Sequence, residues 1–427
     1  MTIDNNIPQG YKQTELGLLP ADWDIQSVGR HCSVKARIGW QGLRSDEYLT
    51  SGEYGLITST DIVDGMVDWR TCCFVSKARY SQDPNIIVQE NDTLISKDGT
   101  IGKVGIVQNI PFPSTLNSGV FVVRPKLDNV YKKYLAFAFK SIYFQDFINR
   151  LTAGSTIVHL YQKDIVKFVF PVPPIAEQRA IAEALSDVDG LIAALDKKIA
   201  KKRLFKQGAM QQLLTGKKRL PGFTNKWVEK PIRLLCKLYG RIGFRGYTKA
   251  DLVHKGEGAI TFSPSDIHEQ VISYTNCDYI SWRKYDESPE IQVFNGDIIF
   301  CKTASIGKCA IIKNLSEKAT INPQFVVLKD FKCNNEWLYY SIIDRKFQTV
   351  VSGITGGSTI PTMSQEKLYE QTLLCPPTIE EQQAIATILS DMDKEIADLE
   401  VQRDKYRLLK SGMMQKLLTG QIRLKTE

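Results

Sequence analysis

The feature that most constrains this chain is a 44-residue segment that occurs twice, at an offset of 204 residues. The first copy begins at Glu177 and reads EQRAIAEALSDVDGLIAALDKKIAKKRLFKQGAMQQLLTGKKRL. The second begins at Glu381 and reads EQQAIATILSDMDKEIADLEVQRDKYRLLKSGMMQKLLTGQIRL. About 25 of the 44 positions are identical, and the match needs no gap. Chance does not produce such a match, so the chain is an internal duplication and must fold as two related halves.

Both copies have the apolar spacing of a long helix. Hydrophobic residues recur at alternating steps of four and three, which is the spacing of a coiled-coil seam. The predicted seam consists of Ile181, Leu185, Val188, Ile192, Leu195, Ile199, Ile385, Leu389, Met392, Ile396, Leu399 and Tyr406. Prolines precede each copy, and Gly216 and Gly420 mark the C-terminal ends. A helix over residues 177–215 would be about 58 Å long. We predict that the two helices pair with each other, antiparallel because a domain separates them, rather than each packing alone in a globular core.

The stretches between the helices match more loosely. ARIGWQG (36–42) corresponds to GRIGFRG (240–246), KDGTIGKVGIV to KTASIGKCAII, and AGSTI to GGSTI. Short Val, Ile and Phe runs broken by Gly, Asn and Asp predict strand-rich domains with small helices. The predicted class is α+β: two pseudo-repeated strand-rich domains separated by two long helices. The predicted boundaries are 1–172 for the first domain with an N-terminal extension, 173–216 for the first helix, 217–375 for the second domain, and 376–427 for the second helix and tail.

The composition narrows the class of protein further. The net charge of +8 leans toward a nucleic-acid partner. Nine cysteines without a C-x-x-C pair and four histidines without ligand spacing predict structural thiols in a reducing compartment and no metal site. No stretch is long and apolar enough to span a membrane, and the N-terminus lacks the pattern of a signal peptide. We therefore expect a cytoplasmic protein.

The motifs of common active sites are missing from the sequence. Lys103 and Lys308 follow glycine, but not in the spacing of a phosphate-binding loop. GTIGKVG has the wrong glycine spacing for a dinucleotide fingerprint, and neither H-E-x-x-H nor G-x-S-x-G occurs. The VPPI and CPPT segments lack the flanking residues of an amino-methyltransferase motif. We predict that the chain is not an enzyme by itself and binds no cofactor.

The paired loops contain side chains suited to a DNA duplex. Arginine can bond a guanine edge, lysine and hydroxyl groups contact phosphates, and amides recognise adenine. The predicted DNA-binding residues are Arg37, Trp40, Lys97, Thr100, Lys103, Asn117, Ser155 and Thr156 in the first domain, and Arg241, Phe244, Arg245, Lys302, Thr303, Lys308, Asn322, Gln324, Ser358 and Thr359 in the second. Each has an ordinary structural alternative: the aromatic residues suit a core, and the two asparagines suit a buried turn. Their recurrence in both halves favours the DNA-binding interpretation.

With the duplication established, the chain resembles the specificity (S) subunit of a type I restriction–modification enzyme, the HsdS family. ARIGWQGL, KDGTIGKVGIV, AGSTIVHLYQKDI and PPIAEQRAIAEAL…LLTG, with their second copies, carry the resemblance over nearly the full length. The second copy departs in having PPTIEEQ, with one extra residue, and Ala304 where the first has Gly99.

The resemblance implies a function that composition does not reveal. Such subunits are non-catalytic and carry two target-recognition domains, which read the two halves of an asymmetric, bipartite double-stranded DNA site. Their helices form an antiparallel coiled coil that docks two modification (methyltransferase) subunits, and two restriction (translocase–nuclease) subunits complete the enzyme. S-adenosylmethionine belongs to the modification subunits, and ATP and Mg²⁺ to the restriction subunits. The alternatives from the residues alone are a coiled-coil scaffold for proteins and a stand-alone DNA-binding regulator.

Overall fold

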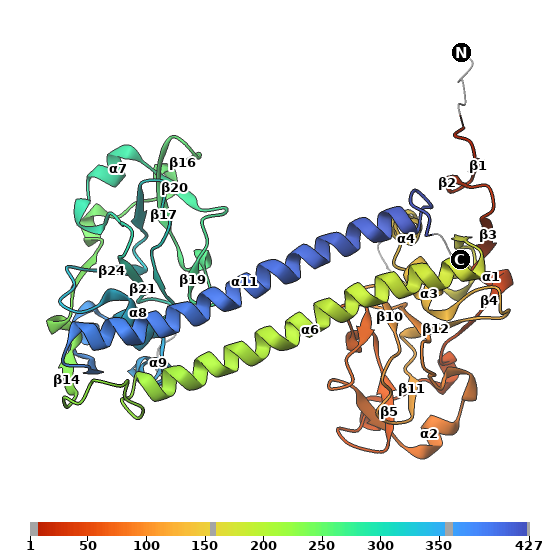
Figure 1. The fold of residues 1–427 in the computed structure, drawn as a ribbon, viewed down its shortest axis with the longest axis horizontal. Helices are drawn as coiled ribbons and strands as arrows, with labels where there is room; N and C mark the ends of the chain where they lie inside the picture. The colour runs from red at the N-terminus through yellow and green to blue at the C-terminus, as the bar shows by residue number, and fades with distance from the viewer. Residues whose placement is uncertain (1–6, 154–158, 355–361, 425–427) are drawn as a thin grey trace, which may run out of the picture. The chain divides into compact units, whose positions relative to one another are not determined.

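The computed structural model describes residues 7–153, 159–354 and 362–424, apart from the side chains of Trp40, Phe244 and Ile354. The chain divides into two compact units. Unit 1 contains residues 1–196 and 402–427, and unit 2 contains residues 197–401. Each unit therefore combines one strand-rich domain with a part of both long helices (Figure 1).

The main sheet of unit 1 has six strands in the order β4-β12-β9-β10-β7-β6, and a second sheet has the order β11-β5-β8. Their bounds are β4 Cys32–Lys35, β12 Val120–Pro125, β9 Thr93–Ser96, β10 Val104–Ile106, β7 Met66–Val67, β6 Ile62–Val63, β11 Ser114–Leu116, β5 Tyr54–Ile57 and β8 Cys73–Val75. Two-stranded ribbons join β1 Tyr11–Thr14 to β2 Gly17–Pro20 and β3 Asp24–Ser27 to β13 Val169–Val172. The helices are α1 Val28–His31, α2 Lys77–Ser81, α3 Lys132–Ala138, α4 Ile142–Thr152 and α5 Gln162–Ile165.

Unit 2 repeats this topology. Its sheets have the orders β15-β24-β21-β22 and β16-β20-β17-β23, with the short ribbon β18-β19 and the pair β14-β25. The bounds are β15 Lys237–Gly240, β24 Phe325–Lys329, β21 Ile298–Cys301, β22 Cys309–Ile311, β16 Leu252–Val253, β20 Asp278–Ser281, β17 Gly258–Phe262, β23 Ala319–Ile321, β18 Ile267–His268, β19 Val271–Ile272, β14 Val228–Pro231 and β25 Thr372–Cys375. The helices are α7 Trp282–Asp286, α8 Asn335–Ile343, α9 Arg345–Ile354 and α10 Gln365–Glu370. In both units the second sheet contains one parallel pair, β5 with β11 and β17 with β23.

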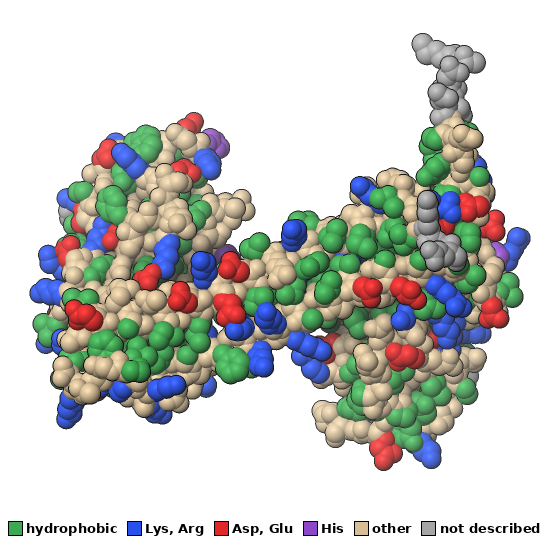
Figure 2. Space-filling view, viewed as in Figure 1, with side chains coloured by type: hydrophobic (Ala, Val, Ile, Leu, Met, Phe, Trp, Pro, Cys, Tyr) green, Lys and Arg blue, Asp and Glu red, His purple; other side chains and the backbone are tan. Residues whose placement is uncertain are grey.

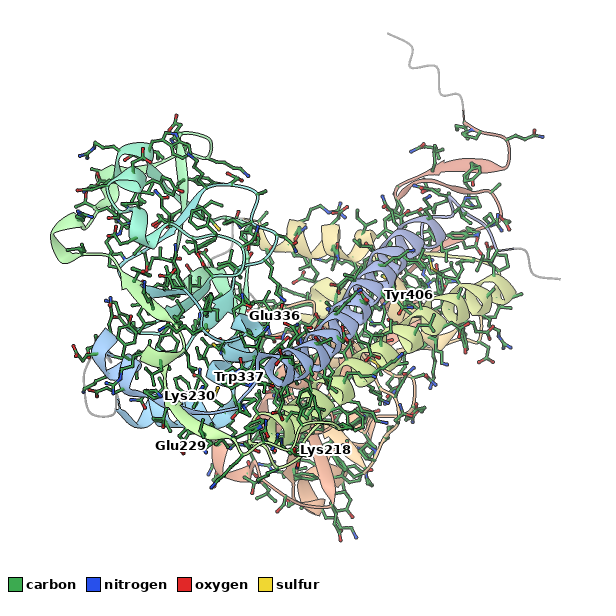
Figure 3. The ribbon with its side chains drawn as sticks, turned by 60° about the vertical axis from the view of Figure 1, so that its left-hand side comes forward. Lys218, Glu229, Lys230, Glu336, Trp337 and Tyr406 are labelled. Atoms are coloured by element: carbon green, nitrogen blue, oxygen red, sulfur yellow. The ribbon has the colours of Figure 1, made fainter. Side chains whose placement is uncertain are left out.

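The main sheet of each unit is buried on both faces. Successive side chains of a strand point to opposite faces. Accordingly, Leu94 of β9 belongs to the core between the sheets, whereas Ile95 belongs to the core that includes the helices. Ile298 and Ile299 of β21 divide in the same way in unit 2. Trp337 of α8, labelled in Figure 3, is completely buried in the helix-side core of that unit.

Two 39-residue helices, α6 Ile175–Leu213 and α11 Ile379–Leu417, run side by side within each unit (Figure 1). In unit 1, Asp189 pairs with Lys410 at 2.5 Å and Asp196 with Arg403 at 3.5 Å. Residue numbers rise along α6 as they fall along α11, so the pairing is antiparallel. In unit 2 the same order relates Lys202 to Glu395 and Lys206 to Asp393. The predicted α+β class and antiparallel helix pair are therefore confirmed.

The predicted seam residues are all buried or half-buried along the helices. Eight are buried: Ile181, Leu185, Val188, Ile199, Ile385, Leu389, Ile396 and Leu399. Four are half-buried: Ile192, Leu195, Met392 and Tyr406, the last labelled on α11 in Figure 3. The buried end of each series belongs to the helix-side core of its own unit, together with the last leucines of the other helix.

Each helix ends in a closed junction with the start of the other. Gly216 and Gly420 adopt φ angles of +66° and +70°, which only glycine adopts without strain. Just beyond, Arg219 reaches Glu381 at 2.7 and 3.0 Å in unit 2. Arg423 reaches Glu177 at 2.7 and 2.8 Å in unit 1. The identical RL endings of the sequence copies thus serve the same purpose in both units.

Candidate nucleic-acid interface

The two units share one loop framework around the predicted DNA-binding residues. The loop after β9 and the loop after β21 are held by equivalent backbone hydrogen bonds, between 2.8 and 3.0 Å long. These bonds are Lys97 N to Gly119 O, Leu160 N to Lys97 O and Ser96 N to Lys103 O in unit 1, and Lys302 N to Gln324 O, Met363 N to Lys302 O and Cys301 N to Lys308 O in unit 2. Each framework brings together three segments that are far apart in the sequence.

The predicted asparagines close the second loop of each framework. Asn117 Oδ1 accepts a hydrogen bond from the Gly119 amide at 2.9 Å. Asn322 Oδ1 accepts one from the Gln324 amide at the same distance, and its Nδ2 also donates to Gln324 Oε1 at 3.0 Å. Both asparagines therefore form a side-chain turn. The two units differ in the amide nitrogen, because Asn322 Nδ2 donates to a neighbouring side chain in unit 2 and Asn117 Nδ2 has no equivalent bond among the described residues of unit 1.

The two predicted arginines lie inside their domains. Arg37 is 2% exposed and Arg241 is 8% exposed. Arg37 Nε donates to Leu116 O at 2.9 Å, and Arg241 Nη2 donates to Ile321 O at 3.3 Å. Burial lowers the pKa of both guanidinium groups. In this arrangement each guanidinium fixes the carbonyl that precedes a turn asparagine, which favours a positioning role over direct contact with a base.

The predicted lysines divide into two groups. Lys308 Nζ donates to Pro264 O at 2.7 Å and to Ile267 O at 3.2 Å, so its ammonium ties the loop to the β18-β19 ribbon. Lys97, Lys103 and Lys302 are half-buried, and Lys97 Nζ lies 5.2 Å from the centroid of the Phe121 ring. An amphipathic lysine in this position keeps its ammonium near the surface, where a phosphate can reach it.

The remaining predicted residues are only partly described. Thr100 is exposed at the tip of its loop, Thr303 is half-buried, and Arg245 pairs with Glu290 at 3.5 Å. The side chains of Trp40 and Phe244 lie outside the described part of the structure, although the backbone forms a short 3-10 turn at both positions. The predicted hydroxyl residues Ser155, Thr156, Ser358 and Thr359 also lie outside the described residues.

Sequence reasoning missed one pair in this framework. Asp98 and His159 form an ion pair or a charged hydrogen bond, depending on imidazole protonation. Asp98 lies between Lys97 and Gly99, in a motif whose predicted contacts are Lys97, Thr100 and Lys103. No sequence signal joins two residues so far apart, whereas the matched framework bonds show that these segments meet.

The helices carry a second repeated feature on their outer faces. Leu204 and Phe205 of α6 are 68% and 58% exposed, and Leu408 and Leu409 of α11 are 76% and 50% exposed. The two pairs are separated by the same 204 residues as the sequence copies. Hydrophobic side chains among charged ones are visible on the helical segment in Figure 2. We call these four residues the apolar ridge pairs.

The described residues contain no group of three or more His, Cys, Asp or Glu side chains that could hold a metal ion. All nine cysteines lie in the described ranges as free thiols, eight of them buried. Burial raises the pKa of Cys32 and Cys72 to about 12, so these thiols are packing groups rather than nucleophiles. Within those ranges, no helix has the length and apolar character needed to cross a membrane.

Two recognition frameworks of one topology, joined to an antiparallel helix pair, define a duplicated recognition subunit. The chain belongs to the family described as the type I restriction modification DNA specificity domain, whose model matches residues 41–202 and 248–405. It is thus a non-catalytic component that recognises DNA sequence in a type I restriction–modification system, as its resemblance implied.

Named relatives agree with this assignment. The chain is 24% identical to the type I restriction enzyme MjaVIII specificity subunit of Methanocaldococcus jannaschii, over 98% of this chain and 97% of that protein. It is 26% identical to the EcoKI specificity subunit of Escherichia coli over 49% of this chain and 45% of the relative. The crystal structure of an S subunit from M. genitalium matches with a TM-score of 0.59 at 13% identity, covering 98% of both chains. That likeness shows a shared fold.

Proposed function

We propose that the two strand-rich domains read the two halves of an asymmetric, bipartite DNA site, and that the helix pair positions two modification and two restriction subunits around it. The observation that carries the proposal is the shared framework with different side chains. Equal frameworks suit equal tasks, while Thr303 in place of Asp98 and Gln324 in place of Gly119 suit different base sequences. S-adenosylmethionine, ATP and Mg²⁺ are then the partners' cofactors, and the complex acts on cytoplasmic DNA.

On the DNA side, we assign the phosphate contacts to Lys97, Lys103 and Lys302. Phosphate contacts set the position of a protein on the duplex, and base contacts supply its specificity. Arg37 and Arg241 position the loops through their buried hydrogen bonds to Leu116 O and Ile321 O. The other predicted contacts remain part of the proposal: Trp40, Thr100, Asn117, Ser155, Thr156, Phe244, Arg245, Thr303, Lys308, Asn322, Gln324, Ser358 and Thr359.

On the partner side, we assign the docking positions to the apolar ridge pairs. Large exposed apolar side chains lose about 25 cal/mol per Å² of favourable free energy by remaining in water, so a repeated pair favours a covering partner. The positions recur once in each sequence copy, which matches two copies of one partner.

The first experiment is co-expression with a modification subunit from the same genome, in a host that lacks adenine methylation, followed by single-molecule sequencing. A split, asymmetric motif with one methylated adenine on each strand is the expected result. A stable complex that methylates a continuous or palindromic motif contradicts the bipartite assignment. If no complex forms and the chain alone binds DNA tightly, the stand-alone regulator replaces it. If neither DNA nor the modification subunit binds, the scaffold does.

A second experiment tests docking. Leu204→Glu with Phe205→Glu, and separately Leu408→Glu with Leu409→Glu, should each reduce the number of bound modification subunits from two to one, measured by native mass spectrometry. Val401→Glu is the matched control, because Val401 is 71% exposed on the same helix while the first copy has Lys197 at its position. Loss of partner from the control, or retention of two partners in both ridge variants, contradicts this assignment.

A further inference from the structure

A carboxylate stands at the loop tip of unit 1 where the framework meets solvent. Asp98 is 45% exposed, and its partner His159 is 29% exposed. The His159 ring lies 4.5 Å from the Tyr161 ring, and Lys163 Nζ lies 5.3 Å from the centroid of the same ring. The carboxylate is therefore held by a cationic or hydrogen-bonding neighbour, yet part of it remains open to a ligand.

Asn117 lies beside this carboxylate. A methyl group in place of the Gly119 hydrogen would be 3.4 Å from both Asp98 Oδ2 and Asn117 Oδ1, so the two side chains flank the same glycine. Asn117 Oδ1 is occupied by the Gly119 amide. Its Nδ2 donates no hydrogen bond to any residue in the described ranges, which leaves a free donor next to a partly open acceptor.

An adjacent donor and acceptor match one edge of a base. Adenine presents the N7 acceptor beside the N6 amino donor in the major groove, and cytosine presents the N4 amino donor. We propose that Asp98 reads an exocyclic amino group in one half of the DNA site, with Asn117 Nδ2 directed at adenine N7. The neighbouring amide donor favours adenine over cytosine. This inference rests on the proposed function and names a specificity-determining residue for it.

The charge balance at the loop permits this role. A carboxylate close to DNA is repelled by phosphates unless cations surround it. His159 contacts Asp98 directly, Lys97 precedes it in the chain, and Lys103 and Lys163 lie on the flanking segments. His159 is a positioning residue, because its direct contact orients the carboxylate without needing to touch the base.

Unit 2 has the same framework and lacks this pair of groups. Thr303 occupies the position of Asp98, and a backbone bridge joins it to Thr362, which occupies the position of His159. Asn322 Nδ2 donates to Gln324 Oε1 and so is not free. A base that fits the groups of unit 1 therefore finds different groups in unit 2, which is the behaviour that two unlike half-sites require.

The test uses the full chain in complex with its modification subunit, and reads the methylated motif of each variant. Asp98→Ala should reduce discrimination at a single base pair of one half-site by about 10-fold or more, because a good base contact contributes roughly 1–3 kcal/mol. Asp98→Asn keeps a carbonyl acceptor and should retain most of the preference. His159→Gln should lower methylation of the site while the preferred base stays the same. Asp128→Ala, an exposed carboxylate of the same unit, is the control for removal of one negative charge.

The second half-site reports on folding in each variant, because unit 2 is unchanged. If Asp98→Ala loses a preference for adenine at one position of the motif, the full proposal is supported. If it loses a preference for cytosine, the role of Asp98 is supported and the assignment of Asn117 is overturned. An unchanged motif in Asp98→Ala, or equal strengthening on all sequences as in Asp128→Ala, overturns the inference. A wild-type complex without a bipartite motif overturns the proposed function itself, and is thereby distinguished from a failure of this inference.

Discussion

The loop tips of the two frameworks adopt the same left-handed backbone with different residues, which provides a reciprocal test of strain. Gly99 has φ +70°, and the equivalent Ala304 has φ +63°. A residue with a Cβ in this region is destabilised by roughly 1–2 kcal/mol, whereas glycine adopts it freely. Replacing alanine by glycine also increases the entropy of the unfolded chain, which offsets about 0.4–1 kcal/mol. Ala304→Gly should therefore stabilise unit 2 by about 0.5–1 kcal/mol.

The reverse substitution should act on unit 1. No atom lies within 4 Å of a Cβ built on Gly99, so Gly99→Ala adds no collision, and its expected cost of about 0.5–1 kcal/mol is conformational alone. Differential scanning calorimetry of the full chain measures both, since 1 kcal/mol shifts Tm by about 2–4 °C in a unit of this size. Gly39→Ala is the control, because Gly39 also has open space but no positive φ, and it should not lower Tm. A lower Tm for Ala304→Gly, or an unchanged Tm for Gly99→Ala, would refute the strain argument.

Three further predictions concern unit 1. Burial lowers the pKa of Lys140 from 10.5 to about 8 in the folded chain, so between these two pH values the unfolded chain holds the proton more strongly. The free energy of unfolding of the wild type should therefore rise by up to about 2 kcal/mol from pH 7.5 to 9.5. Urea titrations should show no such rise for Lys140→Met. Arg37→Ala should destabilise unit 1 by about 3 kcal/mol, because it leaves buried acceptors such as Leu116 O without a donor. If the variant were fully stable and had a relaxed base preference, Arg37 would be a direct base contact instead. Lys103→Ala should weaken binding on every sequence and reduce the salt slope by about 1 in filter-binding assays; a loss confined to one sequence would contradict a phosphate contact.

The features that sequence could predict are those encoded locally or by repetition. The helix pair follows from a seam pattern that any window of the repeat displays, and the equal ends follow from Gly216 and Gly420. Long-range contacts were beyond this reasoning. The neighbouring glycines suggested that Arg37 could reach a base. In the structure its guanidinium donates a hydrogen bond to the carbonyl of Leu116, which is 79 residues away in the sequence. Asp98 and His159 meet only because the sheet brings three loops to one edge.

Long-range contacts also explain why the predicted domain boundaries do not coincide with the two compact units. The boundaries cut between strands and helices, whereas each unit takes the start of one long helix and the end of the other. The junctions are the physical reason. Glu177 is 3% exposed and Glu381 is 1% exposed, and a buried carboxylate must be paired with a cation to remain charged. The required arginine comes from the other sequence copy in both cases.

Removing either arginine should therefore destabilise a single unit. Arg423→Ala leaves Glu177 with the Trp23 indole alone, at 3.0 Å, and Arg219→Ala leaves Glu381 without its bidentate partner. Breaking a buried pair by removing one partner costs about 3–5 kcal/mol. Hydrogen exchange should report faster opening of unit 1 for Arg423→Ala and of unit 2 for Arg219→Ala, and Glu177→Gln should partly rescue the first variant because it removes the unpaired charge. If Arg423→Ala instead loosened unit 2, the pairing of helix ends across the two copies would be wrong. Unit 1 joins residues 1–196 to residues 402–427, so its Arg423–Glu177 junction needs both ends of the chain, whereas the Arg219–Glu381 junction closes unit 2 within the contiguous segment 197–401.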